Sequence, residues 1–169
     1  MFACCNTDTT EQVLDLQESS ENLVILLRLL HEPPCPPTQK PAKDIVEYDP
    51  TTVIPFPLLS VLLELADKYA LHDTVTECLK AHLVAHAVAH PLEVYSFATL
   101  HGMNGVASYA SQYVMPVASY SCDEISLIPN VVAYHKLVQL QDFRRKALRN
   151  LLLEEDIFPH GKYLYLASF

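Results

Sequence analysis

Basic residues, glycine and paired cysteines are scarce in this chain of 169 residues, and each shortage argues against a class of protein. Eleven lysines and arginines against 20 acidic residues give a net charge of −9, which argues against a nucleic-acid partner because phosphate binding needs a basic surface. Three glycines are too few to build a glycine-rich phosphate-binding loop. The five cysteines contain no C-x-x-C pair, which argues against a secreted disulfide framework and against a thiolate zinc site.

The sequence also lacks the segments that direct a chain into or across a membrane. Residues 1–6 do not combine a basic region with an apolar core, so they do not form a signal peptide. The longest apolar runs, residues 23–30 and 53–63, are too short to span a bilayer and are interrupted by Arg28 and Ser60. We therefore expect an intracellular protein, cytoplasmic or nuclear, with reduced cysteines and no membrane contact.

Half of the residues are hydrophobic, which excludes a disordered tail, and their spacing is mostly helical. The serines at 19 and 20 can cap a first helix that ends before the prolines at 33 and 34. Further helices are expected over residues 57–71, from residue 73, and over 91–101, 106–113 and 129–153. Residues 13–16 alternate like a strand. The sequence therefore predicts a mainly α fold with a minor β element.

The spacing also predicts which side of each helix is apolar. The first helix would place Leu23, Leu26, Leu27 and Leu30 on one face. The second would bury a face formed by Leu58, Val61, Leu62, Leu65, Ala66 and Tyr69. The third would bury a stripe formed by Val75, Cys78, Leu79 and Leu83. Packing into a core and binding to a partner are both open interpretations of the first face.

Prolines are concentrated between residues 31 and 57, which hold eight of the 12 in the chain. Proline fixes its own backbone and extends the residue before it, so this segment is predicted to be a stiff, extended surface loop. A second interpretation is that the prolines are a ligand for an aromatic-lined groove in another protein.

No catalytic motif is present, and we predict that the protein is not an enzyme and uses no cofactor. The sequence has no G-x-S-x-G nucleophile elbow and no H-E-x-x-H zinc motif. His82, His86 and His90 are four residues apart, so on one helix they would share a face and could approach a cation. No carboxylate within residues 82–90 completes a ligand set. Exposed helix histidines are therefore predicted, and a metal or small-ligand site on these three residues is kept as an alternative function.

Charge is distributed unevenly along the chain. Residues 11–77 hold twelve acids against four bases, whereas residues 136–149 hold five bases against Asp142 alone. The five bases are Lys136, Arg144, Arg145, Lys146 and Arg149. This cluster can dock an acidic partner or the acidic half of the chain itself, or it can be a solvated helix face.

L-Q-E-S-S-E-N-L at 16–23, followed by L-L-R-L-L-H at 26–31 and the prolines, resembles a segment of fungal BTB/POZ domain proteins of the mushroom type, in which a serine-capped helix precedes a variable loop. L-L-E-L-A-D-K-Y-A-L at 62–71 resembles the next POZ helix. H-P-L-E-V-Y at 90–95, with His101-Gly102, is similar to the helical extension that follows. The resemblance covers residues 13–113.

The family's domain begins upstream with a strand hairpin and a helix that have no counterpart in this sequence. The resemblance therefore implies the C-terminal half of a POZ α/β domain in residues 1–88, with the Pro-rich loop at 32–57, and a helical extension in residues 89–169. It implies a non-enzymatic protein–protein interaction module that dimerises or acts as an adaptor, and the family's docking to a cullin-type ubiquitin ligase scaffold. A non-functional gene fragment is the alternative that the missing half suggests.

Without the missing strands, the apolar face of the first helix would lack its natural cover. We therefore expect a partner protein or a second copy of the chain to bind there. The predicted partner-binding residues are Leu23, Leu26, Leu27, Leu30, Leu62, Leu65 and Tyr69.

Overall fold

The computed structural model describes residues 17–41 and 46–154. The fold is mainly helical with one small antiparallel sheet, which confirms the predicted fold class. The elements are α1 (Ser20–His31), β1 (Gln39–Lys40), β2 (Glu47–Tyr48), α2 (Phe56–Lys68), α3 (Asp73–His86), α4 (Pro91–Leu100), α5 (Asn104–Ser111), a 3₁₀ turn (Val117–Ser119), α6 (Cys122–Ser126) and α7 (Val131–Glu154). None of the helices in the described ranges is both long enough and apolar enough to cross a membrane.

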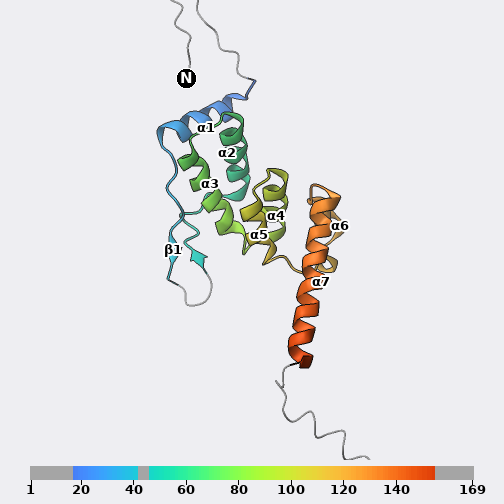
Figure 1. Cartoon of the computed structure of the whole chain (residues 1–169). Helices are drawn as coiled ribbons and strands as arrows, with labels where there is room; N and C mark the ends of the chain where they lie inside the picture. Colours follow the sequence, from blue (N-terminus) through green and yellow to red (C-terminus); the bar gives the residue numbers. More distant parts are fainter. Residues whose placement is uncertain (1–16, 42–45, 155–169) are drawn as a thin grey trace, which may run out of the picture.

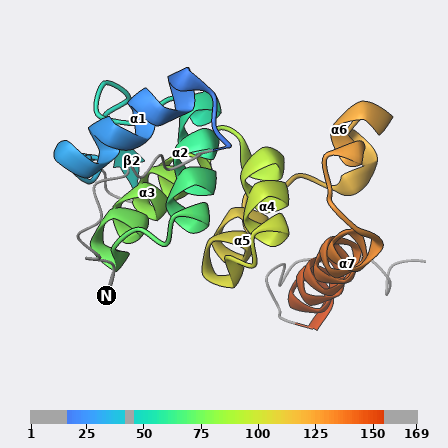
Figure 2. The ribbon, with the colours of Figure 1, turned by 90° about the horizontal axis from the view of Figure 1, so that it is seen from above.

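The order of the helices in space follows their order in the sequence (Figure 1). α1 lies across α2 with α3 beside them, α4 and α5 pack together next, and α6 and α7 lie at the far end (Figure 2). One hydrophobic core runs through this series, from Leu29 of α1 to Leu137 of α7. The C-terminal half of α7 extends beyond the other helices, as Figure 1 shows.

α1 begins and ends as its sequence predicts. The Ser19 hydroxyl accepts a hydrogen bond from the backbone N–H of Asn22 at 3.2 Å, and the prolines stop the helix after His31. The predicted single apolar face is wrong. Leu26 and Leu29 are the buried residues of α1. Leu27 and Leu30 lie outside the buried face and are exposed. The leucines of α1 are spread over more than one face, so spacing alone could not select the inner one.

α2 and α3 form the centre of the core. In α2, Leu59 and Leu63 are buried although they were not among the predicted inner residues. Leu58 was predicted to face inward, but it is 41% exposed. The α2 sequence offers leucines in adjacent positions, so several helical faces fit equally well. The stripe predicted for α3 is confirmed at Leu79 and Leu83, which are buried.

α4 ends where the glycine predicts. Gly102 adopts a positive φ of 68°, and the N–H of Met103 bonds back to the carbonyl of Ala98 at 2.8 Å. The C-terminus of α2 is closed by the same type of backbone hydrogen bond, but with alanine in place of glycine. Ala70 adopts φ 46°, and the N–H of Leu71 bonds to the carbonyl of Ala66 at 2.9 Å.

α6 lies between the helices predicted at 106–113 and 129–153, where no helix was predicted. Ser121 and Glu124 form a reciprocal capping box at its start, so a serine–glutamate signal for this helix was present in the sequence. α7 follows, and the buried hydroxyl of Tyr95 donates to the carbonyl of Ala133 at 2.9 Å, which joins α7 to α4. The Gln141 side chain bonds both to the carbonyl of Met115 and to the N–H of Val117, so the turn before α6 is also held.

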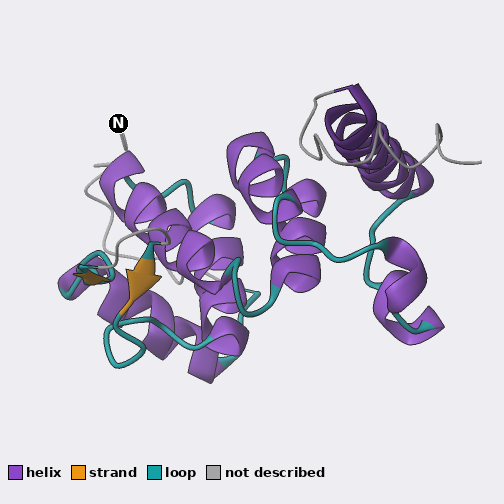
Figure 3. Ribbon diagram, turned by 90° about the horizontal axis from the view of Figure 1, so that it is seen from below, coloured by secondary structure: helices purple, strands orange, loops and turns teal. Residues whose placement is uncertain are grey.

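The two strands lie within the predicted Pro-rich loop, on the side of the molecule formed by α1, α2 and α3 (Figure 3). They pair antiparallel, with Gln39 opposite Tyr48 and Lys40 opposite Glu47. The strand predicted at residues 13–16 lies outside the described residues.

Candidate protein-interaction surface

The outward side of α1 carries an apolar stripe. Val24, Leu27 and Leu30 are 49%, 55% and 56% exposed, and they alternate with the inward Leu26 and Leu29 that hold α1 on the core. We call Val24, Leu27 and Leu30 the outer stripe. A surface helix normally presents polar residues to water, so a helix that is apolar on both sides marks a surface suited to a second protein.

The charges on α1 balance. Glu21 lies in the first turn and Arg28 in the last, so the helix is neutral although the whole chain has a charge of −9. Opposite charges placed in this order also favour the helix dipole. The outer stripe is therefore flanked by charges of both signs.

Glu18 fastens the start of α1 to the end of α2. Its carboxylate pairs with the Lys68 ammonium, accepts from the Asn22 amide at 3.1 Å and accepts from the Tyr69 hydroxyl at 3.3 Å. The Lys68 contact, followed by the Asn22 hydrogen bond, lowers the pKa of Glu18. Tyr69, which was predicted to bind a partner, therefore helps to hold α1 against the end of α2, and α1 carries the outer stripe.

The structure separates the seven predicted partner-binding residues into three groups. Leu27 and Leu30 are exposed on the outer stripe. Leu23 is half-buried at the edge of the stripe, and Tyr69 is half-buried in the Glu18 cluster. The buried residues, which face the core, are Leu26, Leu62 and Leu65.

A shallow groove of about 210 Å³ runs along the other flank of α1, between α1 and α2. Its walls are mostly apolar, and the charged residues Arg28 and Glu32 stand at its edge. The lining residues are Ile25, Arg28, Leu29, Glu32, Pro34, Leu58 and Leu62. Apolar surface is therefore available on both sides of α1.

Three side chains of α3 hold the Pro-rich loop against the core, and we call Cys78, His82 and His86 the loop clasp. The Cys78 thiol donates to the carbonyl of Pro34 at 3.0 Å, and His82 Nε2 bonds the carbonyl of Cys35 at 2.9 Å. His82 Nδ1 accepts from a backbone N–H at 3.3 Å, and His86 Nε2 bonds a carbonyl at 2.8 Å. Both of those backbone groups belong to Ile54. Residues four apart share one helix face, so the clasp meets both ends of the loop.

His82 corrects the prediction of exposed helix histidines, because it is only 1% exposed. Its two partners, one N–H and one carbonyl, fix a neutral ring with the proton on Nε2 and leave no lone pair for a metal. His90 lies beyond the end of α3, 3.7 Å from the carboxylate of Glu93. No group of three or more His, Cys, Asp or Glu side chains within the described ranges is arranged to hold a metal ion.

The buried ring of His82 predicts a stability that depends on pH. Burial lowers its pKa below the ordinary value of 6.5, and the nearby His86 lowers it further, so the unfolded chain takes up the proton first as pH falls. We expect the contribution of His82 to stability to be constant above about pH 7 and to decrease below it, by up to about 1.4 kcal/mol per pH unit, until the folded pKa is passed.

Urea unfolding at pH 7.5 and pH 5.5 measures this loss. The control is His82→Gln, which keeps one donor and one acceptor but does not titrate, so the difference between the two pH values should shrink. An equal difference in both proteins would contradict a neutral, buried His82. Glu18 and Asp49 have lowered pKa values, so their contribution to stability is present above the pKa of the unfolded carboxyl group. This contribution is lost only below the range between these two pH values.

The basic cluster of the sequence lies along α7. The carboxylate of Asp142 pairs with Arg145 at 2.8 Å and with Lys146 at 2.6 Å, and both cations are largely exposed. These pairs lower the pKa of Asp142. Exposed leucines lie among the cations where α7 leaves the core, including Leu148, Leu151, Leu152 and Leu153. This end of α7 has a strongly basic, partly apolar surface, unlike the neutral α1.

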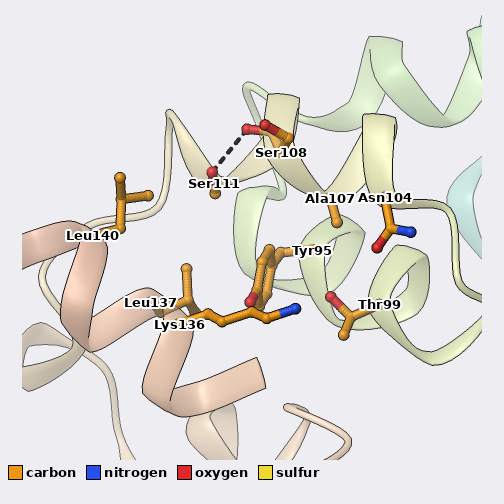
Figure 4. Close-up of a pocket in the computed structure, with 9 residues that line it drawn as sticks. All are labelled: Tyr95, Thr99, Asn104, Ala107, Ser108, Ser111, Lys136, Leu137 and Leu140. Atoms are coloured by element: carbon orange, nitrogen blue, oxygen red, sulfur yellow. Dashed lines mark hydrogen bonds between the residues drawn. The ribbon is translucent and has the colours of Figure 1, made fainter. Parts of the chain in front are cut away.

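A pocket of about 220 Å³ lies between α4, α5 and α7 (Figure 4). The Lys136 side chain crosses its mouth and points toward Thr99, while the Ser111 hydroxyl bonds back to the carbonyl of Ser108. The nine lining residues are Tyr95, Thr99, Asn104, Ala107, Ser108, Ser111, Lys136, Leu137 and Leu140. The set contains no carboxylate, histidine or cysteine, and its ionisable side chains are those of Tyr95 and Lys136.

No protein-family model, no curated protein and no solved structure matches this chain.

Proposed function

We propose that this protein is a non-enzymatic protein–protein interaction module of BTB/POZ type that self-associates through the outer stripe of α1. The observation that carries the proposal is the division of α1 into two apolar sides, with Leu26 and Leu29 buried and Val24, Leu27 and Leu30 about half exposed. Covering the outer stripe removes apolar surface from water, at about 25 cal/mol per Å².

A second copy of this chain is the occupant that the charges favour. Each copy has an overall charge of −9 and is therefore repelled by acidic surfaces. α1 is neutral, with Glu21 at one end and Arg28 at the other, so this helix does not repel a second copy. Two α1 helices packed antiparallel would bring each Glu21 toward the Arg28 of the other copy. The basic end of α7 cannot pair with itself in this way, because its excess charge has one sign.

The arrangement of the first three helices supports the BTB/POZ type. A serine-capped helix leads into a long Pro-rich loop and then into α2, which packs against the first helix, and the resemblance implies these elements in the same order. The free thiols of Cys35, Cys78 and Cys122 support an intracellular location, where cysteines are kept reduced. The alternative function, a metal site on His82, His86 and His90, is disfavoured because both ring nitrogens of His82 already bond to the backbone.

Light scattering of the whole chain across a range of concentrations tests self-association. We expect the measured mass to rise with concentration from 19.0 kDa toward twice that value. Added salt should strengthen the association, because it screens the repulsion between two negative copies while leaving apolar burial intact. A mass that stays at 19.0 kDa at every concentration and salt level would contradict the proposal.

A further inference from the structure

After α1 and Glu32 come four prolines, two on each side of Cys35. Proline fixes its own φ near −65°, and each residue before a proline is held extended, so the sequence Pro33-Pro34-Cys35-Pro36-Pro37 favours a polyproline II path with three residues per turn. This segment descends from the end of α1 beside α3 to β1 (Figure 1).

Burial along this segment repeats every three residues. Pro34 is half-buried and Pro37 is buried, whereas Pro33, Cys35 and Pro36 are exposed. A helix with three residues per turn places Pro34 and Pro37 on one edge and Pro33 and Pro36 on another. One edge therefore faces the protein, and the rest of the segment faces solvent.

The loop clasp holds the inward edge in place. Cys78 bonds the carbonyl of Pro34, and His82 bonds the carbonyl of Cys35, so the backbone is anchored at two successive residues. β1 and β2 hold the chain immediately after the segment, since the N–H of Asp49 bonds the carbonyl of Thr38 at 2.9 Å. The exposed edge is therefore fixed in direction before any partner arrives.

We propose that Pro33 and Pro36, with the exposed Cys35, form a proline ridge that binds the aromatic-lined groove of a polyproline-recognition domain in another protein. Such grooves accept P-x-x-P segments, in which the prolines lie three residues apart, as Pro33 and Pro36 do. An anchored ridge has already lost the conformational freedom that a free peptide loses on binding, which favours affinity. The ridge shares no residue with the outer stripe, so substitutions in one leave the side chains of the other in place.

Binding of the whole chain to a panel of isolated SH3, WW and EVH1 domains, immobilised one by one, tests the ridge. We expect at least one domain to bind, and Pro33→Ala/Pro36→Ala to weaken that binding at least tenfold. The matched control is Pro41→Ala/Pro50→Ala, which changes two exposed prolines of the same loop outside the ridge and should leave binding unchanged.

Thermal unfolding of both double variants should show that they remain folded, because the four substituted positions are exposed. The proposal would be overturned if no domain bound the wild-type chain more tightly than about 1 mM, or if the ridge variant bound as well as the wild type. Weakening by the control pair to the same extent would also overturn it. Light scattering of the ridge variant should match the wild type, which separates this test from that of the outer stripe.

Discussion

Replacing His82 with alanine is expected to lower the free energy of unfolding by about 2–4 kcal/mol. The change removes a buried ring and leaves a cavity beside the N–H of Ile54 and the carbonyl of Cys35, both of which lose their partner. Because these groups belong to the two ends of the Pro-rich loop, the loss should loosen the loop as well as the core. For a protein of this length the melting temperature should fall by about 4–16 °C.

Chemical denaturation of His82→Ala against His90→Ala measures this effect. His90 is exposed, so its removal should change the free energy of unfolding by less than about 0.5 kcal/mol. Limited proteolysis adds a local readout, since cleavage between residues 38 and 54 should accelerate in His82→Ala and not in the control. Equal stability of the two variants would mean that His82 does not clasp the loop.

The double substitution Leu27→Glu/Leu30→Glu is expected to weaken self-association at least about 100-fold. Each leucine contributes about 1.5–3 kcal/mol when it is buried, and each new carboxylate would have to lose its water in the interface. Both side chains are more than half exposed in the single chain, so the fold should be retained. Light scattering at rising concentrations gives the dissociation constant for each protein.

Leu100→Glu/Val131→Glu is the matched control, because it adds the same charge at two exposed apolar positions away from α1. The control should associate like the wild type apart from the small added repulsion, which salt screens. If the control pair disrupted association as strongly as the α1 pair, net charge rather than the outer stripe would govern it. Unchanged association of the α1 pair would place the interface elsewhere.

The sequence predicted helix positions well because their signals are local. Ser19 at the start of α1, Pro91 in the first turn of α4 and Gly102 after its end each act on the adjacent backbone. α6 was missed although Ser121 and Glu124 carry a capping-box spacing, because the helix is a single short turn without an apolar face.

The sequence could not select the inner faces of α1 and α2. Both helices are leucine-rich on several sides, so the face that is buried depends on which neighbour each helix meets. Leu29 rather than Leu30 is buried because α1 rests on α2 along the Leu26–Leu29 line. Only the packed structure contains that information.

The loop clasp was predicted only in part. The four-residue spacing of His82 and His86 indicated a shared helix face, but their rings were predicted to be exposed, with a metal site as the alternative, and His82 is buried. The structure places backbone carbonyls there instead, contributed by Cys35 and Ile54, more than twenty residues away in the sequence. Contacts of this range are set by the path of the Pro-rich loop, which residue types alone do not specify.

Photo-crosslinking from within the outer stripe tests the central proposal most directly. A benzophenone amino acid at position 27 of the whole chain should, on illumination, give a covalent dimer whose crosslinks map to residues 20–31 of the second copy. The same probe at position 100 should give none. A dimer that fails to form at position 27, or crosslinks that map to α7 or to the same chain, would contradict self-association through α1.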